Sequence, residues 1–287
     1  MIDLLTNNEP WIATTSGERL LFLLLRHHSD WRAISAALKA ANVQMARRYD
    51  GLANFFVGAS VLHVQQRLIR HAQDIRELFP YDRSQQVIEM AARMQDVIGL
   101  GPASYSGHYA TLVDEVITSA EQLDKPMGPG LKKAIKRAGP NHCHSCGLEF
   151  GIVPENGTSV LIATVDHAWP RALGGDTIES NLIPTCDICN SKKGHIAAWQ
   201  MAWLQPVVFS DADETKSLKV FPRELKIGLH IRAAMAYAQA NGSTLKDAFL
   251  AIGPREELVR IDSGQGYDFF NLRVHDPART NVDWTPA

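Results

Sequence analysis

One stretch of the chain decides its fold: residues 165–194, VDHAWPRALGGDTIESNLIPTCDICNSKKG. The residues that lead into it, 159–167, are rich in β-branched side chains and predict a strand. The Gly174-Gly175 pair predicts a turn, residues 181–185 a second short strand, and residues 187–193 a short helix. The order strand, loop, strand, helix predicts a small α+β unit at the centre of the chain.

Two CxxC pairs use all four cysteines of the chain: Cys143–Cys146 precedes this unit, and Cys186–Cys189 lies at the entrance of its predicted helix. Two such pairs predict one tetrahedral zinc ion held by four thiolates, which leaves no position for water and makes the zinc structural. A redox dithiol is the alternative for CxxC pairs. His142 and His144 flank the first pair. We expect them to be solvated loop histidines, because four thiolates already fill the zinc shell.

Residues 165–194 closely resemble the HNH endonuclease motif. The family's features stand here in order: an Asp-His pair, Pro-Arg, a Gly-Gly turn, Asn-Leu and a closing CxxCNxxK. The basic segment 130–139 is similar to the helix that often precedes the first zinc pair in this family. The resemblance covers residues 129–200, about a quarter of the chain. It implies a zinc-stapled ββα-metal fold and metal-dependent cleavage of DNA.

The resemblance also implies a role for each polar residue of the motif, in the variant written H-N-N. His167 is expected to be the general base, and Asp166 and Asn190 the ligands of a catalytic divalent cation. Asn181 is expected to orient the loop that carries the base. A pair of oxygen ligands favours Mg²⁺ or Mn²⁺ over zinc at the catalytic position. His195 follows the motif, and we expect it to be solvated or structural rather than a further ligand.

These residue types suit phosphodiester hydrolysis on chemical grounds. A histidine of near-neutral pKa can remove a proton from water. A hard cation can polarise the phosphate and stabilise the departing oxygen. Asp166 and His167 are consecutive at a strand end, so their side chains should point to opposite faces. One of them could then hold the cation while the other addresses water.

Several basic residues near the motif are candidates for contact with nucleic acid. Lys193 shares a helix face with Asn190; we expect it either to assist catalysis by contacting a phosphate or to be an exposed helix lysine. Arg171 is a candidate contact to the DNA backbone, with a plain surface charge as the alternative. The expected helix 130–139 carries a basic stripe, which consists of Lys132, Lys133, Lys136 and Arg137. This stripe either contacts phosphates or forms a solvated face. Trp169 is expected to pack the small core rather than to stack on a base.

The composition is that of a globular protein, with 45% hydrophobic and 21% charged residues among 287. It excludes a disordered, collagen-like or coiled-coil chain. The 29 basic and 31 acidic residues give a net charge of −2, so any nucleic-acid surface must be local. Since no apolar run reaches the ~18 residues of a membrane span and the N-terminus lacks a signal-peptide pattern, we expect a cytoplasmic protein.

Three domains are predicted in a chain that is α+β and mostly helical. Residues 1–128 are expected to form a helical domain of unknown role, residues 129–204 the HNH nuclease domain, and residues 205–287 a C-terminal accessory region with helices and a hairpin. The stretch 123–130, with two prolines and two glycines, is expected to be the linker before the nuclease domain.

Helical periodicity marks particular segments in the flanking regions. In the first region these are 16–25, 30–41, 61–79 and 84–98. In the last region a helix is predicted at 224–240, followed after Asn241-Gly242 by a capped helix to about Ile252. A plain helical hairpin is favoured there over a DNA-reading helix-turn-helix. Residues 258–275 alternate in a way that predicts a β-hairpin.

The leading hypothesis is a metal-dependent DNA endonuclease, placed in restriction or defence against foreign DNA by resemblance alone. RNA stays open as a substrate, because the motif addresses the phosphate backbone. One site cuts one strand, so cutting both would call for a homodimer; a regulatory protein partner is a further candidate. The alternative function is a non-catalytic zinc module that binds nucleic acid or a protein partner. It would need the four cysteines but would be indifferent to His167 and Asn190.

Overall fold

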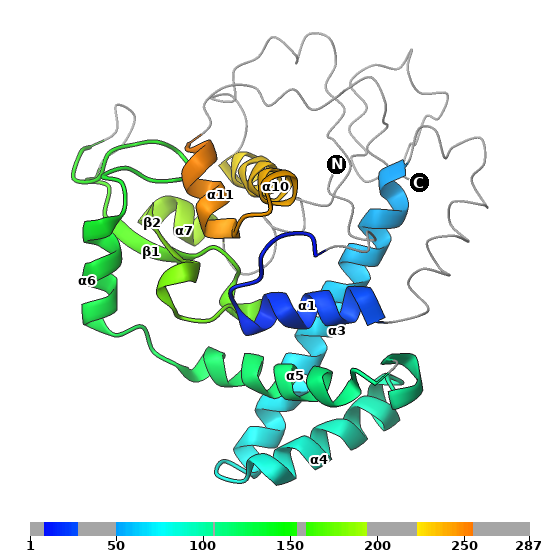
Figure 1. Cartoon of the computed structure of the whole chain (residues 1–287). Helices are drawn as coiled ribbons and strands as arrows, with labels where there is room; N and C mark the ends of the chain where they lie inside the picture. The colour runs from blue at the N-terminus through cyan, green and yellow to red at the C-terminus, as the bar shows by residue number, and fades with distance from the viewer. Residues whose placement is uncertain (1–8, 28–49, 106, 154–158, 194–222, 255–287) are drawn as a thin grey trace, which may run out of the picture.

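A computed structural model describes residues 9–27, 50–105, 107–153, 159–193 and 223–254. This part of the chain is mostly helical, with one small antiparallel sheet in the central region (Figure 1), which confirms the predicted α+β class. The expected helix 30–41, the hairpin 258–275 and His195 lie outside the described residues. Among those described, no helix combines the length and the apolar character needed to cross a membrane.

In the described part of the N-terminal region there are four α-helices: α1 (Ser16–His27), α3 (Asp50–Leu78), α4 (Arg83–Arg93) and α5 (Tyr109–Asp124). Helix α3 runs across α1 and α5 and contacts both (Figure 1). Apolar residues on α1 recur at helical spacing and are fully buried in this core, among them Leu20, Leu21 and Leu24. The helices predicted at 16–25, 61–79 and 84–98 are confirmed with shifted ends.

The helix predicted at 84–98 changes from α-helical to π-helical hydrogen bonding near its C-terminal end. Asp82 caps the start of helix α4, because its carboxylate accepts from the Gln85 amide at 2.9 Å. The helix continues as a π-helical turn, η1 (Met94–Ile98), which Gly99 closes with a positive φ of 76°. A short 3₁₀ turn, η2 (Pro102–Tyr105), then leads to α5. The coil from α5 to the next helix is shorter than the predicted linker.

The central unit follows the predicted order of elements. Helix α6 (Pro129–Ala138) precedes strand β1 (Ala163–His167), two 3₁₀ turns, strand β2 (Leu182–Cys186) and helix α7 (Asp187–Lys193). The turns are η3 (Arg171–Leu173) and η4 (Glu179–Asn181). The strands are antiparallel, with Ala163 opposite Cys186 and His167 opposite Leu182. Helix α6 packs on both strands.

Strand β1 is shorter than the predicted 159–167, and its partner strand gives the reason. Strand β2 ends at Cys186, because α7 begins at the next residue. Residues before Ala163 therefore have no strand partner. Their backbone groups bond elsewhere: Leu161 donates to the Ile152 carbonyl at 3.0 Å, and Ile162 accepts from the Asp187 amide at 3.1 Å.

The C-terminal described segment is a helical hairpin, as predicted: α10 (Arg223–Asn241) and α11 (Leu245–Ile252). Gly242 makes the turn with a φ of 56°, and the Thr244 hydroxyl caps α11 by accepting from the Asp247 amide at 3.1 Å. The hairpin lies beside the central unit (Figure 1), with α10 against α7. Lys246 of α11 donates to the Glu179 carbonyl at 2.6 Å.

Candidate active site and metal centre

The four cysteine sulfurs form one cluster between the first CxxC loop and the start of α7. Their sulfur atoms all lie within 4.8 Å of one another, and the Sγ atoms of Cys146 and Cys186 are 3.9 Å apart. A tetrahedral zinc ion with Zn–S bonds of about 2.3 Å sets its sulfurs about 3.8 Å apart. The four cysteines therefore fit a single structural zinc ion, as their spacing predicts.

The local backbone explains how the two pairs meet. The first pair sits on a tight loop, where the Gly147 amide donates to the Cys143 carbonyl at 2.9 Å and Gly147 adopts a φ of 75°. In the second pair, the Cys189 amide donates to the Cys186 sulfur at 3.3 Å. Hydrogen bonding to Cys143 and then to the other two sulfurs raises the pKa of Cys189. Holding all four as thiolates thus calls for a bound cation.

Asp166, near the end of β1, is a buried carboxylate of the candidate active site. Its Oδ2 accepts from the Lys193 ammonium at 2.7 Å, and its Oδ1 accepts from the His167 amide at 2.8 Å. Burial alone would raise the pKa of Asp166, but the charge of Lys193, followed by the neighbouring His144, lowers it to about 2. The carboxylate is therefore ionised at neutral pH.

Lys193 is not an exposed helix lysine, so that alternative is wrong. Its side chain is buried, with 6% of the residue surface exposed. Besides the bond to Asp166, the ammonium donates to the His167 carbonyl at 2.6 Å. Lys193 thus joins the end of α7 to the end of β1. Whether it also contacts a phosphate stays a prediction.

His167 faces away from Asp166, as expected for consecutive strand residues. Its Nε2 lies 3.1 Å from the Thr177 hydroxyl, on the loop between the strands. Burial lowers the pKa of His167 to about 4, against the attraction of the Asp166 charge. The imidazole is therefore neutral at pH 7 and able to accept a proton.

Asn181 holds the loop that follows His167, at the position where the resemblance places such a residue. Its Oδ1 accepts from the Trp169 amide at 2.7 Å, and its Nδ2 donates to the carbonyls of Trp169 and Asp176 at 3.1 and 3.0 Å. Trp169 is 1% exposed, and its indole donates to the Leu173 carbonyl at 2.8 Å. The expectation that Trp169 packs in the core is confirmed.

Asn190 lies over β1 on the same side as Asp166. Its Nδ2 is 3.3 Å from the Thr164 hydroxyl, and Thr164 is two residues before Asp166 on the strand. Alternating strand residues share a face, so the Asn190 amide and the Asp166 carboxylate border the same side of the sheet. An ionised carboxylate and an amide oxygen are donors that suit a hard divalent cation. An ionised carboxylate can also accept more than one partner, so a cation and Lys193 could both contact Asp166.

His144 is the residue of this site that the sequence interpretation placed wrongly. It is not solvated: 6% of its surface is exposed, and its Nε2 lies 3.9 Å from Asp166 Oδ2. Its ring packs against His230 and Phe249 at centroid distances of 5.5 and 5.2 Å. Its Nδ1 has no hydrogen-bond partner among the described residues. The residue lines a cavity of about 10 Å³ beside Asp166, room for about one water molecule.

The remaining basic candidates fall into two groups. Arg171 is half-buried and donates to the backbone carbonyls of Leu123 and Lys125, so it ties η3 to the end of α5 and is not a plain surface charge. The basic stripe of α6 is exposed, whereas Ile135 on the same helix is buried. The stripe consists of Lys132, Lys133, Lys136 and Arg137. Contact of either group with nucleic acid stays a prediction.

The geometry defines a ββα unit with a four-cysteine cluster that could hold one metal ion and an Asp-His pair at the end of its first strand. Residues 143–195 match the family model described as HNH endonuclease. This segment is therefore an HNH domain. No curated protein and no solved structure matches the chain.

Proposed function

We propose that the protein is a metal-dependent endonuclease that hydrolyses phosphodiester bonds of DNA. The observation that carries this proposal is the pair at the end of β1. One member, Asp166, is ionised and faces α7; the other, His167, is neutral and faces the opposite side, where its Nε2 lies beside the Thr177 hydroxyl of the loop. An anionic ligand beside a neutral base is what hydrolysis of a phosphodiester by activated water requires.

In this proposal each residue has a separate task. His167 accepts the proton of the attacking water, and Thr177 and Asn181 fix the position of the imidazole through the loop. Asp166 and Asn190 would hold a divalent cation, Mg²⁺ or Mn²⁺, which when bound supplies polarisation of the phosphate and stabilisation of the leaving oxygen. Lys193 keeps Asp166 ionised and adds positive charge beside the reacting phosphate.

The nucleic acid would approach along the exposed basic stripe of α6. This helix packs on β2 and on β1, the strand that carries the Asp-His pair. Backbone contacts of this kind favour no particular base sequence. We place the activity in restriction or defence against foreign DNA, on the resemblance of the motif alone. Cutting both strands would require a homodimer or two successive nicks.

The test is a cleavage assay on supercoiled plasmid, linear duplex, single-stranded DNA and RNA, each with Mg²⁺, Mn²⁺ or chelator. His167→Ala and Asn190→Ala are compared with His63→Ala, a control that removes an exposed histidine from α3. The proposal expects cation-dependent cleavage of DNA by wild type and His63→Ala, and at least a hundredfold loss for His167→Ala, within the range for a general base. Equal cleavage by all variants would refute it.

A second candidate function is a non-catalytic zinc module that binds nucleic acid. Two observations favour it: the Lys193 ammonium donates to Asp166 at 2.7 Å, and residues of α10 and α11 border the cavity beside that carboxylate. This function expects DNA binding without cleavage, abolished by loss of zinc and unaffected by His167→Ala. Gel-shift titrations of the same variants separate the two functions.

A further inference from the structure

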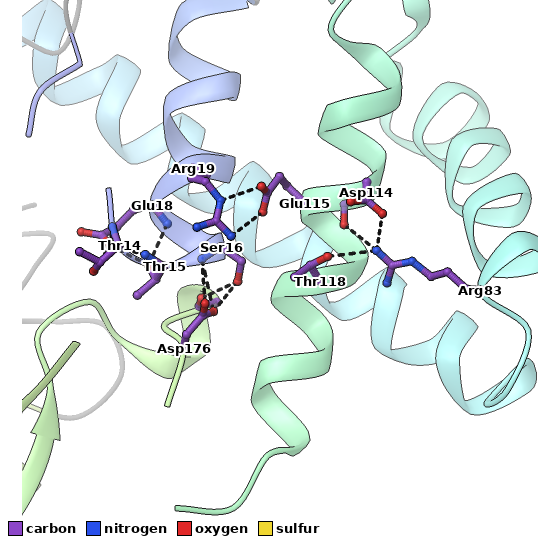
Figure 2. Close-up of polar contacts among 11 residues, drawn as sticks. Thr14, Thr15, Ser16, Glu18, Arg19, Arg83, Asp114, Glu115, Thr118 and Asp176 are labelled. Carbon is purple, nitrogen blue, oxygen red and sulfur yellow. Dashed lines mark hydrogen bonds and ion pairs between the residues drawn. The ribbon is translucent and has the colours of Figure 1, made fainter. Parts of the chain in front are cut away.

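The N-terminal helices contact the catalytic loop directly. Here the catalytic loop means residues 168–181, between β1 and β2. At the start of α1, the Ser16 hydroxyl donates to Asp176 Oδ1 at 2.5 Å, and the Ser16 amide lies 3.3 Å from both carboxylate oxygens (Figure 2). The next amide, that of Gly17, donates to the Gly174 carbonyl at 2.9 Å. Ser16 is fully buried and Asp176 is 8% exposed, so the contact is shielded from water.

A second contact comes from α3. The Gln65 side-chain amide donates to the Gly17 carbonyl at 2.7 Å and to the Leu173 carbonyl at 2.8 Å. The same Leu173 carbonyl accepts from the Trp169 indole. Gln65 is fully buried. One side chain of α3 therefore bonds at once to α1 and to the catalytic loop, and fixes the distance between them.

The contacts continue from the N-terminal helices to the base. Asp176, held by Ser16, is followed by Thr177, whose hydroxyl lies 3.1 Å from His167 Nε2. The Asp176 carbonyl accepts from Asn181, which also holds Trp169. A shift of Asp176 would therefore move Thr177 and alter the orientation of the imidazole.

The start of α1 and the N-terminal helices pack closely against the catalytic loop. A Cβ on Gly17 would lie 1.9 Å from the Leu173 carbonyl oxygen, and a Cβ on Gly174 would lie 2.7 Å from the Ser119 Cβ of α5. Buried polar contacts are also costly to leave unmade, so both the close packing and the hydrogen bonds oppose a shift of α1 relative to the catalytic loop.

We propose that the N-terminal helices position the general base, and that Ser16, Gln65 and Asp176 are positioning residues of the reaction. The helical region is then a working part of the nuclease and not a separate accessory domain. This inference rests on the proposed endonuclease function, because it assigns the three residues a role in orienting His167.

The test compares Ser16→Ala and Gln65→Ala with Arg83→Ala in the full-length protein. Arg83 bonds Asp114 and Thr118 between α4 and α5 (Figure 2), so its loss weakens the same helical region without touching the catalytic loop. We expect Ser16→Ala and Gln65→Ala to lower kcat roughly tenfold or more, as small misplacements of catalytic groups do, with KM unchanged. Arg83→Ala should keep the wild-type kcat. Equal kcat for all three variants would overturn the proposal.

A conservative variant separates positioning from mere support of the fold. Asp176→Asn keeps an oxygen that can accept from Ser16, so it should retain most of the kcat that Asp176→Ala loses. Equal losses in the two Asp176 variants, at matched folded fractions, would contradict the positioning role.

Hydrogen exchange makes the result independent of cleavage. Ser16→Ala should speed exchange of the amides in residues 168–181, and Arg83→Ala should not. If wild type fails to cleave any substrate, the endonuclease function falls, whereas faster loop exchange still supports the mechanical coupling. Unchanged loop exchange in Ser16→Ala would overturn the coupling whatever the cleavage result.

Discussion

The Lys193 ammonium lies 2.7 Å from the Asp166 carboxylate, and both groups are buried. Two charges removed from water in this way depend on each other, because either one alone would remain uncompensated. The pair also joins the last residue of α7 to the penultimate residue of β1. The conformation of the Asp-His pair is thus tied to the helix that carries Asn190.

Lys193→Met should destabilise the protein strongly. It leaves the Asp166 carboxylate buried without its partner, a loss of about 3–5 kcal/mol in comparable buried pairs. The double variant Asp166→Asn/Lys193→Met removes both charges and should recover part of that loss. The free energy of unfolding is measured in urea for wild type, these two variants and a control, Lys192→Ala, on the exposed side of α7. A Lys193→Met protein as stable as wild type would show that the pair does not form.

Acid should destabilise the folded state through His167. Its pKa is about 4 in the folded protein, against 6.5 for an unperturbed histidine. On acidification the unfolded chain therefore binds the proton first. The contribution of His167 to the free energy of unfolding is fully present above about pH 6.5 and is lost as the pH falls toward 4. At pH 5 the loss relative to pH 7 is on the order of 2 kcal/mol. Asp166, with a pKa lowered to about 2, adds a further loss only below about pH 4.

The measurement is urea unfolding at pH 7 and pH 5 for wild type, His167→Gln and the control His63→Gln. His167→Gln should lose less stability on acidification than the other two proteins. The same pH dependence in all three would mean that His167 is not protected from protonation.

The parts of the site that are local in the chain can be predicted from the sequence. The strand, loop, strand and helix and the two CxxC pairs all lie within about fifty residues, where spacing and turn residues determine the geometry. The role of Asn181 in holding the loop follows instead from the resemblance of the same segment to the HNH motif. The burial of His144 and Lys193 could not be predicted in this way. It depends on Ile227, His230 and Phe249, which α10 and α11 bring over them from far along the chain.

The contact between Ser16 and Asp176 was beyond sequence reasoning for the same reason. The two residues are 160 positions apart, and neither lies in a sequence pattern that predicts a contact with the other. A serine before an apolar run indicates only a helix start. The length of β1 was also mispredicted, because β-branched residues favour a strand whether or not a partner strand is present.

Removal of zinc should unfold the central unit. The four sulfurs form the link between the first CxxC loop and the β2–α7 junction, and a structural zinc site contributes its binding energy to folding. We expect about one zinc per chain by metal analysis. Strong chelation or Cys189→Ser should abolish the contribution of buried Trp169 to the near-ultraviolet circular dichroism spectrum. A metal-free protein with an unchanged spectrum would contradict the structural role.

Gly17→Ala should destabilise the protein, although alanine is the better helix former by about 1 kcal/mol. The added Cβ would collide with the Leu173 carbonyl, a form of overpacking that costs about 1–3 kcal/mol. Gly130→Ala is the matched control: it is also the second residue of its helix, α6, and has open space around it. It should be neutral or slightly stabilising in the same thermal unfolding measurement. Equal effects at the two positions would argue against the tight contact of α1 with the catalytic loop.

The most direct test of the central claim is the single-turnover rate at which the protein nicks supercoiled plasmid in saturating Mn²⁺. The claim is that His167 and Asp166 form a metal-dependent phosphodiesterase centre. It predicts nicking that chelator abolishes and that falls at least a hundredfold in His167→Ala, with zinc content and unfolding midpoint at pH 7 close to those of wild type. Nicking at the wild-type rate by a folded, zinc-loaded His167→Ala protein would contradict it.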